Sequence, residues 1–357
     1  MLDNRMDEVS RGKIKSIQSN VAAMLAERQA LRDPSAPPSS YWSDFCSAFD
    51  YMLGLPEPAF LKLRIHTYHF TAETYQNYYF GDAAQFWAAN HVAQLTEDIP
   101  PALVINEPPN GIGFHYPPNR FISEDSLRFQ KVIITLYQSG VLKKVREKKG
   151  SPLLLEIGAG YGGLAHHVYS TIPGATYVIA DLPEALLFSA AYITLHNPSK
   201  RIYVYKPGDD LKAVVSGIEK GQFDFVLIPN YKLEALRSLR FDLVLNTASF
   251  QEMKSEQVEA YLDFIRDTCV GVLYSRNQDR QPKNAELSSL SQMLRARFQI
   301  TPVPEWQPPG KGPVPLRRRL RSLARSLASG LGLLEPVKQD TPYLAFICTP
   351  LRSAKAQ

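Results

Sequence analysis

The chain has 357 residues, of which 45% are hydrophobic and 21% are charged. These are ordinary globular values, so they exclude a disordered or fibrous chain, and the length allows two domains or one large elaborated domain. The net charge of +5 depends on residues 311–325, which carry six basic and no acidic side chains; without them the chain has 34 basic and 35 acidic residues. The excess of basic residues is therefore confined to this segment, which argues against a general nucleic-acid-binding surface.

The cysteines and the N-terminus indicate the compartment. Cys46, Cys269 and Cys348 are odd in number and far apart, so they form neither a disulfide framework nor a zinc-binding pattern. The first residues, "MLDNRMDEVSRGKIKSIQ", are too charged for a secretory signal, and no apolar run approaches the length of a membrane span. We expect a cytoplasmic protein.

The N-terminal part is predicted to be mainly helical. Residues 5–32 have an amphipathic helical pattern, and "DPSAPPSS" at 33–40 breaks it. Residues 41–100 alternate helical patterns with an aromatic cluster, whose rings at 68–87 either form core or line an acceptor pocket. His66 and His69 have H-x-x-H spacing, but no acidic cluster accompanies them, so we expect no metal site.

A proline- and glycine-rich segment follows at 106–120, "NEPPNGIGFHYPPNR". It predicts a long constrained loop without regular structure, and such loops often carry function. A further helix is predicted over 123–147. We therefore divide the chain into a mainly helical cap or substrate region, 1–147, and a second domain, 148–357.

In the second domain, strand and helix patterns alternate, which indicates an α/β fold with a parallel sheet. Either 202–205 or 224–228 is the third strand, and the pattern leaves both open. Ligands of such sheets bind at the carboxyl ends of the strands. The predicted strands are 152–157, 176–181, 202–205 or 224–228, 241–246, 271–275, 297–303 and 342–348.

The first predicted strand ends in a glycine-rich loop, "LLLEIGAGYGG", at 153–163. Gly158, Gly160 and Gly163 have the G-x-G-x-x-G spacing of dinucleotide sites, and Asp181 follows the next strand at the distance of a ribose-binding acid. Glu156 separates the two ligand classes, because its carboxylate would repel a pyrophosphate but attract the cationic methionine end of S-adenosylmethionine. The loop favours a methyl donor, with a nicotinamide cofactor as the alternative.

Four motifs together resemble the putative sugar O-methyltransferases, which are class I S-adenosylmethionine-dependent enzymes: "LLLEIGAGYGGLA", "YVIADLPEALLFSAAYI", "FDLVLNTASFQEM" and "GVLYSRN". The resemblance covers roughly residues 120–280 well, and the N-terminal third loosely through "NYYFGD". It implies a seven-stranded Rossmann-like sheet, S-adenosylmethionine as cofactor, and a small-molecule or glycan acceptor with a sugar hydroxyl. A partner protein that retains the fold without catalysis is a further alternative.

Physical roles follow for the residues at this edge. Asp181 would accept hydrogen bonds from ribose hydroxyls. Asn230 would lie near adenine, or Asp209 and Asp210 would if 202–205 is the third strand. Asn246 ends a strand where the donor methyl group should face the acceptor. The expected cofactor-binding set is Glu156, Gly158, Gly160, Tyr161, Gly162, Asp181, Leu182, Asn230 and Asn246.

A sugar hydroxyl is a poor nucleophile, so a general base should assist methyl transfer. Glu252 in "SFQEM" is the first candidate because it follows the fourth strand on the ligand edge. Alternatively, Glu252 is an acid at a helix N-terminus that interacts favourably with the helix dipole. His115, in the proline-rich loop, is the second candidate.

The segment 311–334 predicts a basic amphipathic helix, with leucines on one face and arginines on the other. It either packs its leucines on the domain or contacts an anionic surface. An insertion between the last two strands would leave from the ligand edge, so its arginines favour a phosphate- or lipid-linked acceptor or a peripheral membrane contact. The oligomeric state is left open.

Overall fold

A computed structural model describes residues 6–31, 37–71, 95–97, 99–116, 120–304 and 342–351. The predicted basic helix at 311–334 and most of the aromatic segment at 68–87 lie outside these ranges. In the part of the chain that is described, no helix combines the length and apolarity needed to span a bilayer.

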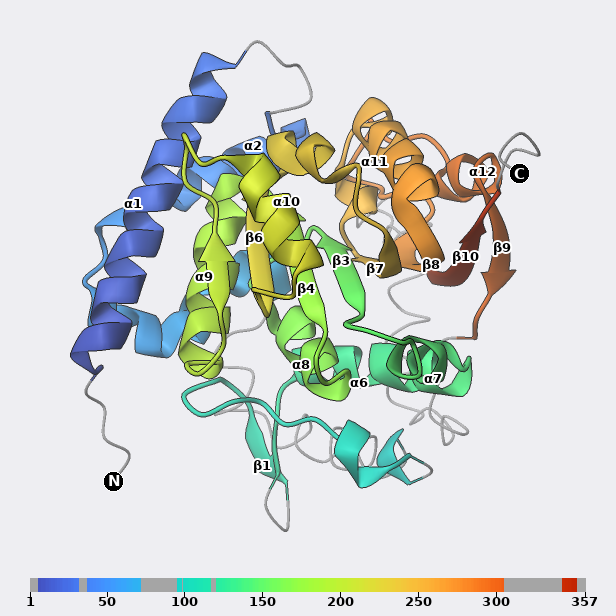
Figure 1. The fold of residues 1–357 in the computed structure, drawn as a ribbon, viewed down its shortest axis with the longest axis horizontal. Helices are drawn as coiled ribbons and strands as arrows, with labels where there is room; N and C mark the ends of the chain where they lie inside the picture. The colour runs from blue at the N-terminus through green and yellow to red at the C-terminus, as the bar shows by residue number, and fades with distance from the viewer. Residues whose placement is uncertain are drawn as a thin grey trace, which may run out of the picture.

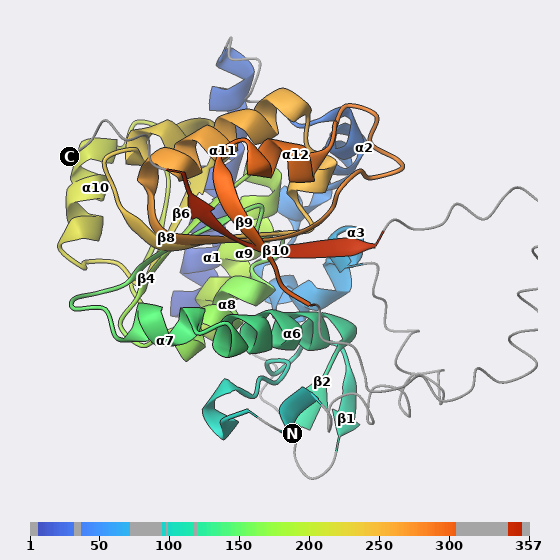
Figure 2. The ribbon, with the colours of Figure 1, turned by 90° about the vertical axis from the view of Figure 1, so that its right-hand side faces the viewer.

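One eight-stranded sheet forms the centre of the molecule (Figures 1 and 2). Its strand order is β5-β6-β4-β3-β7-β8-β10-β9, and all neighbours are parallel except that β10 runs antiparallel to β8 and β9. The strands are β3 (Leu153–Ile157), β4 (Thr176–Asp181), β5 (Ile202–Val204), β6 (Phe225–Pro229), β7 (Phe241–Thr247), β8 (Cys269–Gln278), β9 (Phe298–Pro302) and β10 (Tyr343–Pro350).

The order confirms the Rossmann-like fold class. The run β6-β4-β3-β7-β8 reproduces the 3-2-1-4-5 order of a doubly wound sheet. The expected number of seven strands was wrong, because both candidates for the third strand form strands. β6 lies beside β4, and β5 adds an edge strand with Ile202 opposite Phe225.

Helices cover both faces of the sheet (Figure 2). α11 and α12 lie on one face, and α6, α7 and α8 lie on the other. Because both faces are covered, β3 and β6 are buried along their whole length, which explains their continuous apolar sequences. The helices of this part are α8 (Gly163–Thr171), α9 (Pro183–His196), α10 (Leu211–Glu219), α11 (Ser255–Thr268) and α12 (Leu290–Arg295), with the 3-10 helices η4 (Asn230–Leu236) and η5 (Phe250–Glu252).

The N-terminal region is mainly helical, as predicted, and packs on the sheet domain. Helix α1 lies along α9 (Figure 1), so α9 is buried on nearly every side. Ile14, Val21 and Met24 of α1 join the same hydrophobic core as the strands. The region contains α1 (Glu8–Ala30), α2 (Ser40–Ala48), η1 (Asp50–Gly54), η2 (Glu57–His66), α3 (Tyr68–Thr71) and η3 (Pro101–Leu103).

Two local predictions need correction. The helix predicted over 123–147 is two helices, α6 (Glu124–Gln138) and α7 (Val141–Arg146), because Gly140 adopts a φ of 76° between them. The segment 106–120 was predicted to lack regular structure, but it contains β1 (Phe114–Tyr116), which forms a short antiparallel hairpin with β2 (Arg120–Ile122). Two three-residue strands are too short to show a period among so many glycines and prolines.

Candidate active site

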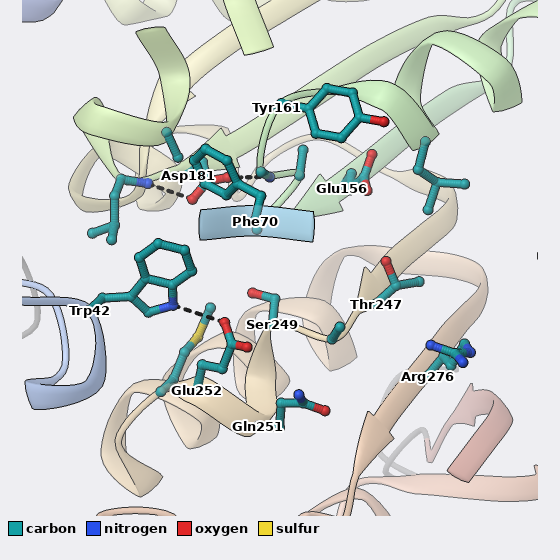
Figure 3. Close-up of a pocket in the computed structure, with 18 of the residues that line it drawn as sticks. Trp42, Phe70, Glu156, Tyr161, Asp181, Thr247, Ser249, Gln251, Glu252 and Arg276 are labelled. Carbon is teal, nitrogen blue, oxygen red and sulfur yellow. Dashed lines mark hydrogen bonds between the residues drawn. The ribbon is translucent and has the colours of Figure 1, made fainter. Parts of the chain in front are cut away.

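A cavity of about 480 Å³ lies at the carboxyl ends of the parallel strands (Figure 3). Its walls come from the glycine loop after β3, the segments after β4, β6 and β7, and the end of β8. Helix α6 and the N-terminal segments around α2 and α3 complete it. The cavity therefore occupies the predicted ligand edge and joins both regions of the chain.

The glycine loop is shaped by protein neighbours. Gly158 has a φ of 72°, and a Cβ atom built on it would lie 1.8 Å from the Ser249 hydroxyl oxygen. Gly160 has a φ of 58°, and a Cβ atom built on it would lie 3.3 Å from the Phe70 ring. Both positions require glycine because of their backbone conformation and these close contacts. Ala248, beside Ser249, also has a positive φ, 55°, which is an uncommon conformation that clusters at functional sites.

Asp181 ends β4 and faces the glycine loop (Figure 3). Its carboxylate accepts hydrogen bonds from the backbone N–H groups of Gly160, at 3.0 Å, and Leu182, at 2.8 Å. Burial raises the Asp181 pKa to about 7, although these hydrogen bonds oppose the shift. A carboxylate has about four acceptor sites, so two backbone donors leave capacity for ribose hydroxyls.

Glu156, on β3, is 1% exposed and borders the same cavity. The Tyr177 hydroxyl donates to its Oε2 atom at 2.6 Å. Burial raises the Glu156 pKa to about 8, the Tyr177 bond opposes this, and the charge of Asp181 adds to it. A cation at this end of the cavity would favour the ionised form of both carboxyl groups.

Asn230 follows β6 and lines the cavity. Its Oδ1 atom is a buried acceptor with no hydrogen-bond partner among the described residues. The alternative acids lie elsewhere: Asp209 accepts from the Tyr203 hydroxyl, and Asp210 caps α10. An unused acceptor at this strand end suits the exocyclic amino group of adenine, so the geometry favours Asn230 over the two aspartates.

Two predicted cofactor residues, Tyr161 and Gly162, have mainly structural contacts. The Tyr161 ring borders the cavity, but it packs against Tyr192 and under the Arg64 guanidinium, 4.3 Å from the ring centroid. Gly162 is the N-cap of α8.

Asn246 is fully buried and lies outside the described lining of the cavity. Its Nδ2 atom donates to the Ile157 carbonyl, and its Oδ1 atom accepts from Phe250 N and Asn277 Nδ2. The side chain thus ties β3, β7 and β8 together, and it does not border the cavity in which we expected it to lie beside the donor methyl group.

Of the two predicted bases, the structure brings Glu252 to the cavity and leaves His115 away from it. Glu252 lies on η5, and its Oε2 atom accepts a hydrogen bond from the indole N–H of Trp42 at 2.9 Å (Figure 3). Burial raises the Glu252 pKa to about 8; hydrogen bonds from Trp42 and Gln251 oppose the shift, and the charge of Asp181 adds to it. His115 is exposed on β1, against Phe121, in a hairpin that lies beyond α6 (Figure 2).

Several cavity residues were not predicted. Trp42 and Tyr41 come from α2, and Tyr343 begins β10, so no local spacing connects them with the glycine loop. Gln251 and Arg276 lie inside the motifs "SFQEM" and "GVLYSRN", so these motifs could have identified them as cavity residues. The Arg276 guanidinium lies 4.2 Å from the Tyr343 ring centroid, and Gln251 donates to the Tyr343 hydroxyl at 3.3 Å.

The H-x-x-H pair does not form a joint site. His66 is hydrogen-bonded to the Tyr51 hydroxyl at 2.8 Å, whereas His69 lines the cavity beside Phe45 and Phe49. Across the described ranges, no group of three or more histidine, cysteine or acidic side chains is arranged to hold a metal ion.

The donor set fits S-adenosylmethionine better than a dinucleotide. The ligand would meet two carboxyl groups, Glu156 and Asp181, which suit an ammonium or sulfonium charge and ribose hydroxyls but repel a pyrophosphate. Arg128 also lines the cavity, but it is engaged with Asp125 at 2.9 Å.

No protein-family model matches the chain, and no curated protein matches it. Among solved structures, it is similar to Haemonchus contortus phosphoethanolamine N-methyltransferase 2 in complex with S-adenosyl-L-methionine, at 12% identity and a TM-score of 0.32, over 60% of this chain and 52% of that one. The chain therefore spans about half the length of that enzyme.

Two further solved structures show the same level of similarity. One is precorrin-6y C5,15-methyltransferase from Geobacter metallireducens, at 12% identity and a TM-score of 0.31, over 59% of this chain and 87% of that one. The other is the plantazolicin methyltransferase BpumL in complex with SAH, at 11% identity and a TM-score of 0.32, over 82% and 96%. Similarities this weak carry no argument about activity, so the fold assignment rests on the strand order, and the ligand on the cavity.

Proposed function

We propose that this protein is an S-adenosylmethionine-dependent O-methyltransferase that methylates a hydroxyl of a sugar or glycosylated metabolite. One observation carries the proposal: a single cavity holds a carboxyl-lined donor end at the glycine loop and a separate, partly buried carboxyl group, Glu252, on the segment after β7.

At the donor end, each part of the ligand has a matching group. Asn230 offers its acceptor to adenine, Asp181 offers its remaining acceptor sites to ribose, and Glu156 faces the cationic methionine end. A nicotinamide dinucleotide would place its pyrophosphate beside two carboxyl groups, which argues against the oxidoreductase alternative.

At the other end, aromatic and amide side chains border the cavity. Tyr41, Trp42 and Tyr343 supply flat apolar surfaces, and Gln251 and Gln281 supply hydrogen-bonding groups. Flat rings with polar edges suit the apolar faces and hydroxyls of a sugar. This supports a glycan acceptor, whether it is neutral or linked to phosphate or lipid.

The reaction needs alignment and one proton transfer. The acceptor oxygen forms a bond to the donor methyl carbon as the carbon–sulfur bond breaks, and the hydroxyl proton passes to the Glu252 carboxylate. With its pKa raised to about 8, Glu252 is a stronger base than an ordinary carboxylate, but it is ionised in only part of the molecules at pH 7. Turnover should therefore rise between pH 7 and pH 9.

The test is transfer of labelled methyl groups from S-adenosylmethionine to a panel of neutral, acidic and phosphate-linked sugars. We expect Glu252→Gln to lower turnover by about 100-fold or more, with S-adenosylhomocysteine affinity unchanged, because a general base contributes to the chemical step alone. Glu286→Gln, outside the cavity lining, is the matched control. Full activity of Glu252→Gln would show that Glu252 is not the general base. Donor binding without any methylated acceptor would favour the non-catalytic alternative.

A further inference from the structure

The N-terminal end of α2 is hydrogen-bonded to the segment that carries Glu252. The Ser39 hydroxyl donates to the Glu252 backbone carbonyl at 2.6 Å, and the Trp42 indole N–H donates to its side chain at 2.9 Å. Glu252 is therefore held at both its backbone and its carboxyl group by residues more than 200 positions away in the sequence.

Two more contacts fix the same segment to the sheet domain. The Gln257 amide donates to the Pro37 carbonyl at 3.0 Å, and Ser40 donates to Glu286 through both its backbone N–H, at 3.0 Å, and its hydroxyl. These contacts anchor the start of α2 without touching Glu252.

The Trp42 ring itself is held by aromatic neighbours. It lies 5.5 Å from Phe45, 5.6 Å from Phe70 and 6.5 Å from Phe49, measured between ring centroids. A packed ring keeps its N–H direction fixed, so the hydrogen bond to Glu252 costs little additional ordering.

We infer that Trp42 is a positioning residue for Glu252: its N–H fixes Oε2 and stabilises the carboxylate form that receives the acceptor proton. This inference rests on the proposed function. The mainly helical N-terminal region then contributes to proton transfer as well as to covering the substrate.

The charge state of Glu252 also depends on other groups around the cavity. Asp181 from β4 disfavours its ionisation, and Tyr41 from α2 interacts with it electrostatically. His69 from α3, Arg276 from β8 and Tyr343 from β10 border the same cavity. Burial and Asp181 both favour the neutral carboxyl group, so the Trp42 bond works against them and keeps ionisation within reach of neutral pH.

The experiment measures the titration of Glu252 in the full chain, with no acceptor required. Glutamate labelled with carbon-13 at the carboxyl group gives a resonance that is assigned to Glu252 by its loss in Glu252→Gln. We expect Trp42→Phe, which keeps an aromatic ring, to raise the titration midpoint by about one pH unit, the usual size of a lost charged hydrogen bond. Ser40→Ala, which loosens the same segment at Glu286, should leave the midpoint unchanged.

An unchanged midpoint in Trp42→Phe, or an equal shift in Ser40→Ala, would overturn the inference. If Trp42→Phe does not fold, the wild-type protein still decides: the Trp42 indole N–H resonance must titrate together with Glu252 and lose that titration in Glu252→Gln. S-adenosylhomocysteine binding, measured in parallel, keeps the two claims separate. If the wild type does not bind S-adenosylhomocysteine, the proposed function is contradicted. If the Glu252 titration midpoint is unchanged in Trp42→Phe, only the role of Trp42 is contradicted.

Discussion

At the residue scale, the cavity concentrates three carboxyl groups whose pKa values burial raises: Glu156 to about 8, Asp181 to about 7 and Glu252 to about 8. Without a ligand, these groups hold protons that ordinary acids would have lost at neutral pH. Perturbed groups of this kind cluster at functional sites, because the energy stored in burying them is recovered when a complementary ligand arrives.

This predicts that donor binding depends on pH. A cationic donor favours the carboxylate forms of Glu156 and Asp181, so it lowers their pKa values and releases protons on binding. Because the pKa values are higher in the free protein than in the complex, affinity should rise with pH, by about tenfold between pH 6 and pH 8.

Calorimetry with S-adenosylmethionine in buffers of different ionisation enthalpy measures both the affinity and the protons released. Glu156→Gln should flatten the dependence. Affinity that stays constant or falls over this pH range would contradict the assignment of these carboxyl groups to the donor end.

At the element scale, the "DLPE" motif also accounts for the docking of α1. Pro183 occupies the first turn of α9, where its missing N–H costs nothing, and Glu184 follows it. Arg28 at the end of α1 binds the Glu184 carboxylate through two hydrogen bonds of 2.8 and 2.5 Å, and the side chains are only 14% and 6% exposed.

Breaking this pair should be costly. We expect Arg28→Ala to lower the free energy of unfolding by about 3 kcal/mol, because it leaves the Glu184 charge buried without its partner. Adding Glu184→Gln should recover part of that loss, which a purely packing role of Arg28 would not allow. Urea unfolding of the single and double variants measures both effects, and a loss below about 0.5 kcal/mol would show that α1 docks by its apolar face alone.

The elements also show what the sequence could predict. The strands before the glycine loop and before Asp181 were located correctly, because burial on both faces gives continuous apolar runs. β5 could not be separated from β6, since an edge strand of three residues carries almost no pattern. The location of Glu252 at the cavity could be predicted from its place after a strand, whereas its contact with Trp42 is a long-range one that no local spacing records.

At the scale of the whole molecule, the division into residues 1–147 and 148–357 does not separate two cores. Buried residues from α1, α6 and the sheet form one continuous hydrophobic cluster, from Met6 to Cys348. Residues 148–357 expressed alone should therefore expose the apolar faces of α8 and α9 and lose one wall of the cavity.

We expect that shortened chain to show no cooperative thermal transition and no donor binding, measured by calorimetry and circular dichroism. A sharp transition with intact binding of S-adenosylhomocysteine would show instead that the N-terminal region serves the acceptor alone.

The central claim is that the cavity binds a methyl donor. Titration calorimetry of the full chain with S-adenosylhomocysteine tests it most directly, with NADH as the competing ligand and Asp181→Ala as the site variant. We predict one binding site per chain for S-adenosylhomocysteine, no binding of NADH, and at least tenfold weaker affinity in Asp181→Ala, which loses the ribose acceptor and a support of the glycine loop. Absence of S-adenosylhomocysteine binding at millimolar concentration, or clear binding of NADH in its place, would contradict the account.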